Sequence, residues 1–306
     1  MNIAHPGTLQ SDMPPTVPLH ETPNESRIRS LAPWQATCVV VLAFLLALPL
    51  LFVPGLLASR TALGAFGTTV MTGSVGVCGA LVGFVLLARA LNVSPRVFFL
   101  DWPTRQSLRW TLVTVCLIVV ICFTAYRTGG VVVPQTGYTP KELLLRVLAA
   151  IAVGLWTGIV EEFLLRGVVL SVIGHHWHWP GAIIVSAIVF GILHQGGGDT
   201  TTAAILYVLL TSVAGVFFGI LVVVTGNVWN AVAVHATWNA GFAGYLVGFN
   251  VTAEPLPVIV LLGDAHWLLG AGGSAPAESP LAIILFVVLL AAFLLRTSTT
   301  IAHDSP

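Results

Sequence analysis

The sequence predicts an all-α fold, a polytopic membrane helix bundle of about eight transmembrane helices. Of the 306 residues, 57% are hydrophobic and only 8% are charged, whereas a soluble domain carries about 25% charged residues. The apolar residues gather in segments close to the roughly 20 residues that a helix needs to cross a bilayer. The formal net charge is zero, so we expect the lipid bilayer, and no nucleic acid, as a partner.

The chain begins with a polar stretch and continues through eight apolar segments. Residues 1–32 are rich in proline, threonine and serine and contain no apolar run. We therefore expect a disordered cytoplasmic tail rather than a signal peptide. The predicted spans are 34–57, 64–92, 108–126, 143–173, 180–196, 203–225, 228–249 and 280–296. Residues 250–279 are predicted to form an external loop, in which the apolar piece 258–262 would lie on the membrane or dip into it.

These segments divide the chain into four parts. They are the tail (1–32), the N-terminal transmembrane helices (33–140), a core that carries most of the polar motifs (141–250), and the external loop with the last helix (251–306). More arginines fall in the loops on the side of the N-terminus than on the other side. The positive-inside bias therefore predicts a multi-pass protein with both termini in the cytoplasm, and we expect it in the plasma membrane.

Two adjacent glutamates, Glu161 and Glu162, lie inside the fourth apolar segment. Inserting a carboxylate into the middle of a membrane-spanning helix costs about 2.5–3.5 kcal/mol on insertion scales, so such a residue is by default a functional-site candidate. Glu162 and Arg166 are four residues apart and share a helix face, where they can form an ion pair. Glu161 is rotated by about 100° from Glu162 and can face a different environment, such as a water-filled cavity.

Two further patterns lie in other predicted helices. Phe190 and His194 are four residues apart in the fifth segment, so the ring can pack beside the imidazole. His235 and Asn239 have the same spacing in the seventh segment and share a face. Simple counting puts the two histidines at different depths, unless the helices are short, tilted or offset. Each pattern alone also fits polar contacts that hold helices together, but all three together favour a functional site.

The three patterns resemble the conserved blocks of the CAAX-protease and bacteriocin-processing (CPBP or ABI) family of intramembrane glutamic endopeptidases. The order of the blocks matches, and Gly167 after Arg166 also fits the first block. The resemblance covers roughly residues 145–245. It implies a peptide or protein substrate, which is prenylated for the eukaryotic relatives, and metal-independent catalysis without a cofactor.

The resemblance also implies a role for each motif residue. Glu161 would activate a water, and His194 would position or deprotonate it. His235 and Asn239 would stabilise the oxyanion of the tetrahedral intermediate. Glu162 and Arg166 would be a supporting pair that orients the helix. Peptide hydrolysis does require a base for the water and donors where negative charge develops.

Several alternatives stay open from the residues alone. The chain could be a non-catalytic scaffold or bacteriocin-immunity protein, or a proton-coupled small-solute transporter that uses the buried carboxylate and histidines as a relay. By ligand type, Glu161, His194 and His235 could hold a metal. A second cluster, His175, His176 and His178, could bind zinc or copper, although an interfacial loop with aromatic anchors is the simpler interpretation.

Overall fold

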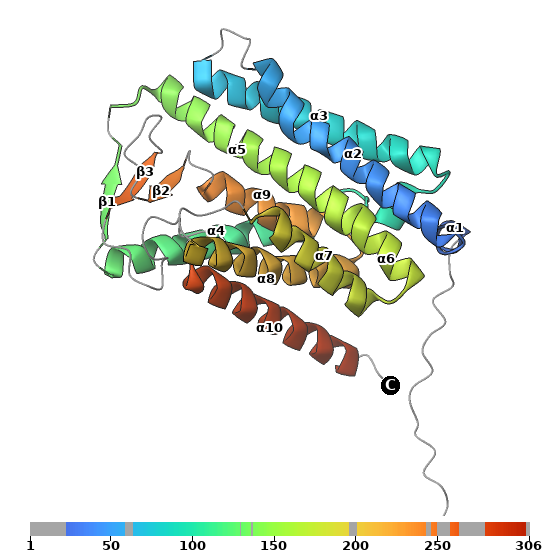
Figure 1. Ribbon diagram of the computed structural model, residues 1–306. Helices are drawn as coiled ribbons and strands as arrows, with labels where there is room; N and C mark the ends of the chain where they lie inside the picture. Colours follow the sequence, from blue (N-terminus) through green and yellow to red (C-terminus); the bar gives the residue numbers. More distant parts are fainter. Residues whose placement is uncertain are drawn as a thin grey trace, which may run out of the picture.

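A computed structural model describes the protein over residues 23–58, 64–128, 130–135, 137–195, 201–242, 246–249, 258–262 and 279–303. Over these residues the fold is a helix bundle (Figure 1). The helices long and apolar enough to cross a membrane are Pro33–Leu51, Phe66–Ala90, Arg105–Arg127, Pro140–His176 and Ala204–Thr225. Trp179–Leu193 and Pro280–Leu295 are shorter apolar helices. The predicted all-α polytopic bundle is thus confirmed.

The helices follow the predicted segments in order, with three corrections at their ends. Their bounds are α1 (Pro23–Arg29), α2 (Pro33–Ala58), α3 (Gly64–Ala90), η1 (Pro95–Phe98), α4 (Arg105–Arg127), α5 (Pro140–Glu162), η2 (Phe163–Val169), α6 (Leu170–His176), α7 (Trp179–Leu193), α8 (Thr201–Thr225), α9 (Trp229–Phe242) and α10 (Pro280–His303). The predicted fifth segment ends at Leu193 rather than 196, and the seventh at Phe242 rather than 249. The last helix continues beyond 296 to His303.

Part of the predicted disordered tail is ordered in the structure. Helix α1 lies within it, and the Arg29 side chain donates a hydrogen bond to the backbone carbonyl of His175 at 3.2 Å. A ring nitrogen of His176 lies 3.1 Å from the carbonyl oxygen of Leu31. These contacts place the start of α2 beside the end of α6. Residues 1–22 of the predicted tail lie outside the described residues.

A small three-stranded sheet was not predicted. Its strands are β1 (Val131–Pro134), β2 (Val247–Phe249) and β3 (Ile259–Leu262), in the order β1-β3-β2. Strand β3 pairs antiparallel with β1 and parallel with β2. The apolar piece 258–262 is therefore mostly the central strand of a sheet rather than a membrane-dipping segment. Most of the predicted external loop 250–279 lies outside the described residues.

One continuous helix, formed by α5, η2 and α6, runs from Pro140 to His176. It begins at a capping box, in which the Thr139 side chain accepts from the backbone N–H of Glu142 and the Glu142 side chain accepts from the backbone N–H of Thr139. Segment η2 has π-helical geometry and starts directly after Glu162. Such π segments are rare and are frequent at functional sites.

The contact between α5 and α9 is close because of glycines on α5. A Cβ added at Gly154 would lie 2.2 Å from the backbone oxygen of Ala236, and one at Gly158 would lie 3.0 Å from the backbone nitrogen of Ala236. Helix α9 therefore lies directly along the part of α5 that leads to Glu161. Figure 1 shows α2 and α3 on one side of the long helix and α8 and α10 on the other.

Candidate active site

The predicted site residues lie around one cavity of about 340 Å³ between α5, α7, α8 and α9. Four of them line it directly together with Phe190. The cavity wall combines polar groups with aromatic and aliphatic side chains, so it can hold water or a polar backbone beside apolar side chains. The lining residues are Val153, Thr157, Glu161, Phe190, His194, Tyr207, Leu210, Thr211, Ala214, Phe218, His235, Trp238, Asn239, Phe242 and Phe286.

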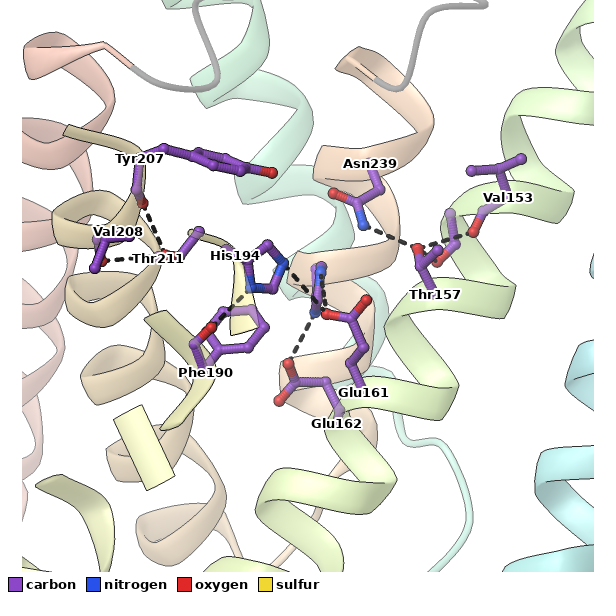
Figure 2. Close-up of polar contacts among 12 residues, drawn as sticks. Val153, Thr157, Glu161, Glu162, Phe190, His194, Tyr207, Val208, Thr211 and Asn239 are labelled. Carbon is purple, nitrogen blue, oxygen red and sulfur yellow. Dashed lines mark hydrogen bonds and ion pairs between the residues drawn. The ribbon is translucent and has the colours of Figure 1, made fainter. Parts of the chain in front are cut away.

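Glu161 is the point on which the two histidines converge. Its Oε2 atom lies 3.7 Å from Nε2 of His194 (Figure 2). The same atom lies 3.8 Å from Nε2 of His235. The Glu161 side chain is 21% exposed, whereas its Oε2 atom is buried and has no hydrogen-bond partner among the described residues. Both distances exceed that of a direct hydrogen bond. Glu161 is thus poised to exchange a proton with either imidazole through a small movement or a water.

Glu162 points into the protein core instead of the cavity. Its Oε1 atom accepts a hydrogen bond from Arg166 at 3.0 Å and lies 2.8 Å from Nδ1 of His235. The side chains of Glu162 and Arg166 are fully buried. The predicted intrahelical ion pair is therefore present, and Glu162 also reaches across to α9. The Arg166 guanidinium lies over the ring of Phe190 at 4.4 Å and over that of Phe218 at 5.2 Å.

The hydrogen bonds at Nδ1 fix the tautomers of both histidines. In His194, Nδ1 lies 2.7 Å from the backbone oxygen of Phe190, and in His235, Nδ1 lies 2.8 Å from Glu162. A carbonyl or carboxylate oxygen only accepts, so each Nδ1 must carry the hydrogen. In the neutral state each Nε2 is consequently an acceptor. Three acceptors then face one another, and an extra proton or a water is needed to supply hydrogens between them.

Asn239 lies one helical turn after His235 and is held by α5. Its amide Nδ2 donates to the hydroxyl of Thr157 at 2.9 Å, and that hydroxyl donates in turn to the backbone oxygen of Val153 at 2.9 Å (Figure 2). Because the Thr157 hydrogen is used on Val153, its oxygen can only accept from Asn239. One Nδ2 hydrogen remains for a ligand in the cavity.

The sequence predicted different depths in the membrane for His194 and His235, and the short helices of the structure explain how the two residues can still meet. Helix α7 has 15 residues and α9 has 14, which correspond to about 21–23 Å at 1.5 Å per residue. Neither spans a hydrocarbon core of about 30 Å. His194 directly follows the end of α7, and its side chain is 21% exposed. There it meets the middle of the long helix and α9.

Some residues of the site were not singled out in the sequence. Thr157 precedes Glu161 by four residues, and this i, i+4 spacing could have indicated it. Phe218 of α8 stacks on His235 with ring centroids 5.5 Å apart, and Tyr207 lies edge-on to His194 at 5.6 Å. Phe218 and Tyr207 reach the site through the tertiary packing of α8, which no local sequence pattern predicts.

The histidine cluster near 175–178 has structural roles. His178 caps α7 by accepting from the backbone N–H of Gly181 at 2.9 Å. His176 contacts the backbone oxygens of Val172 and Leu31, and His175 packs edge-on against Trp179. Within the described residues, no group of three or more His, Cys, Asp or Glu side chains is arranged to hold a metal ion. The predicted interfacial loop is shorter than expected, because His175 and His176 belong to the last turn of α6 and His178 is the N-cap of α7.

Comparison with known proteins gives one family. Residues 143–241 match the family of type II CAAX prenyl endopeptidases described as Rce1-like. The match contains α5 to α9 almost completely, and therefore every predicted site residue. No curated protein matches the chain. The family is described as one of endopeptidases, and the matched segment contains the motifs in Glu161–Arg166, Phe190–His194 and His235–Asn239. Over this segment, which is about a third of the chain, the protein is similar to the CAAX prenyl endopeptidases.

Proposed function

We propose that the protein is an intramembrane endopeptidase that hydrolyses a peptide bond with a water activated by Glu161 and His194. The observation that carries the proposal is the convergence of one Glu161 oxygen with two imidazole Nε2 atoms, at 3.7 and 3.8 Å, beside a cavity. Of these groups, Glu161 and Nε2 of His194 can accept the two hydrogens of one water and leave its oxygen lone pair available for attack. The carboxylate is close enough to receive the proton.

The reaction proceeds through a tetrahedral intermediate. The water oxygen bonds to the carbonyl carbon, its proton passes to Glu161, and negative charge develops on the carbonyl oxygen. The Asn239 amide donates to this oxyanion. His235 also donates through Nε2 when it is protonated, and the Glu162 carboxylate at 2.8 Å from Nδ1 stabilises that charged form. The proton held by Glu161 then passes to the departing amine as the C–N bond breaks.

This scheme gives Glu162 a specific task, which is to hold His235. A carboxylate bound to Nδ1 of a catalytic histidine orients the ring and stabilises the imidazolium, as in the Ser-His-Asp triad. Arg166 neutralises the buried carboxylate and packs on Phe190 and Phe218. Glu162, Arg166 and Phe190 are therefore positioning residues, and Glu161, His194, His235 and Asn239 are the proposed catalytic residues.

The substrate is proposed to be a peptide or protein that enters a largely apolar cavity from the bilayer, and we place the protein in the plasma membrane with both termini in the cytoplasm. Side chains such as Leu210, Phe242 and Phe286 line the cavity beside the polar groups. A hydrophobic residue or a lipid attached to the substrate would be accommodated there. No residue of the site requires a metal ion or cofactor for the proposed steps.

The test is cleavage of a quenched peptide library by the full chain in detergent. Glu161→Gln keeps the shape of the side chain and removes its basicity, so we expect cleavage to fall by about 10²–10⁴-fold. Glu142→Gln is the matched control because Glu142 is exposed at the first turn of α5. Activity that survives in Glu161→Gln, or that a chelator removes, would contradict the mechanism. Solute flux into vesicles without peptide cleavage would favour a transporter.

A further inference from the structure

A second cavity lies between the loop that joins α3 to α4 and the start of α9. Its volume is about 460 Å³, and it is separate from the active-site cavity in every lining residue. The wall consists of apolar side chains and a polar rim: Leu81, Val85, Ser94, Pro95, Arg96, Leu100, Asp101, Trp102, Phe163 and Trp229. The proposed protease chemistry does not use this cavity.

The position of this cavity is that of a membrane interface. The loop joins the spans Phe66–Ala90 and Arg105–Arg127, so it must lie where the chain leaves and re-enters the bilayer. Trp102 in this loop is 82% exposed, as expected for an indole at the headgroup level. Val85 and Leu81 lie five and nine residues before the end of α3, which is about 8 and 14 Å along a helix. The cavity therefore extends from the headgroup region into the acyl-chain region.

The polar rim carries one cation and one anion side by side. Nε of Arg96 lies 3.5 Å from Oδ2 of Asp101, and the two side chains are 75% and 42% exposed. Asp101 is held in place, because its Oδ1 accepts from the backbone N–H of Trp102 and its carbonyl oxygen accepts from the indole of Trp229. The carboxylate consequently stays beside the apolar wall, whatever Arg96 binds.

We propose that this cavity binds a zwitterionic phospholipid with a primary ammonium group, that is, a phosphatidylethanolamine. The phosphate would bind Arg96, the ammonium would bind Asp101, and one acyl chain would lie against Leu81, Val85 and Phe163. The charges of the headgroup and the rim then match one for one. An anionic lipid would instead bring its phosphate close to Asp101 without a compensating cation. A choline headgroup cannot donate a hydrogen bond to the carboxylate.

The same cavity is lined by residues at the start of the two segments that carry active-site residues, η2 and α9. Phe163 directly follows Glu162, and its ring packs edge-on against Trp229 at 5.4 Å and Phe84 at 5.6 Å. Trp229 is the first residue of α9, the helix that carries His235. A lipid in the cavity therefore buttresses both the start of η2 and the first turn of α9.

Native mass spectrometry of the full chain in detergent tests the proposal without any assay of catalysis. We would titrate phosphatidylethanolamine, phosphatidylcholine and phosphatidylglycerol with identical acyl chains. We expect phosphatidylethanolamine to be retained with an affinity about twofold to fivefold higher than the other two. One exposed or half-buried charge contact is worth up to about 1 kcal/mol, and tenfold corresponds to about 1.4 kcal/mol.

The variants separate the headgroup contact from the apolar contact. Asp101→Asn should remove the preference for phosphatidylethanolamine, whereas Arg96→Gln should weaken all three lipids, because each of them carries the phosphate. Val85→Trp fills the cavity from a half-exposed position of α3 and should weaken all three lipids. Arg105→Gln is the control, since Arg105 is an exposed cation of the same interface outside the cavity. Equal affinities of the three lipids for the wild type, a preference that survives in Asp101→Asn, or unchanged affinities in Arg96→Gln would overturn the proposal.

Discussion

The pair of Glu162 and Arg166 offers the sharpest test of how the site is built. Both side chains are fully buried, and Nη1 of Arg166 lies 3.0 Å from Oε1 of Glu162. Removing one member of a buried ion pair leaves an uncompensated charge and costs about 3–5 kcal/mol, whereas replacing both by apolar residues is often nearly neutral. We therefore expect Arg166→Met and Glu162→Leu to be strongly destabilising alone, and the double variant to be less so than their sum.

These losses of stability correspond to shifts of the melting temperature. At roughly 2–4 °C per kcal/mol for a large domain, each single variant should melt about 6–20 °C below the wild type. The double variant still leaves Nδ1 of His235 without its acceptor, a cost of about 1–3 kcal/mol. It should therefore melt about 2–12 °C below the wild type. Unfolding followed by tryptophan fluorescence in one detergent measures all three.

The control is the exposed ion pair of Arg96 and Asp101. Its charged groups are 3.5 Å apart, but the side chains are 75% and 42% exposed, so Arg96→Met should cost less than about 1 kcal/mol. The reasoning is refuted if Arg166→Met is as mild as Arg96→Met. It is also refuted if the losses of the two single variants simply add in the double variant.

Two further predictions concern the packing of α5 on α9. Thr157→Val removes the acceptor that orients the Asn239 amide, so kcat should fall by about tenfold with the melting temperature unchanged. Thr237 lines a different cavity, so Thr237→Val should keep full activity. An equal loss of kcat in the two variants would count against the role of Thr157. Gly154→Ala should destabilise the protein by about 1–3 kcal/mol, and more than Gly158→Ala does. The reason is that the added Cβ meets the α9 backbone at 2.2 Å in the first variant and at 3.0 Å in the second. Unfolding in detergent measures the difference, and a larger loss of stability in Gly158→Ala would refute this account of the helix contact.

The sequence predicted those features that local spacing determines. An i, i+4 relation suffices for the ion pair of Glu162 and Arg166 and for the ring contact of Phe190 and His194, whose centroids lie 4.5 Å apart. Apolar segment lengths predicted the order of the helices. They could not distinguish strand β2 from the end of a helix, because a short apolar run fits both. The pairing of β1, β2 and β3 depends on residues far apart in the chain.

The features that the sequence left open are those made by tertiary contact. The depth of His194 depends on where α7 begins and ends relative to the bilayer and the long helix, which hydropathy does not define. Phe218 reaches His235 only because α8 packs beside α7 and α9. The π-helical geometry of η2 is likewise not visible in the residue pattern, although the segment begins directly after Glu162.

The adjacency of the two glutamates has a geometric explanation in the imidazole of His235. The two nitrogens of this ring face different neighbours on α5: Nδ1 lies 2.8 Å from Oε1 of Glu162, and Nε2 lies 3.8 Å from Oε2 of Glu161. Consecutive helical residues diverge by about 100°, which directs one carboxylate into the core and the other towards the cavity. One ring at the α5–α9 contact can therefore touch both. In the mechanism that we propose, the core carboxylate orients the ring of His235, and the cavity carboxylate exchanges protons with the water and the substrate.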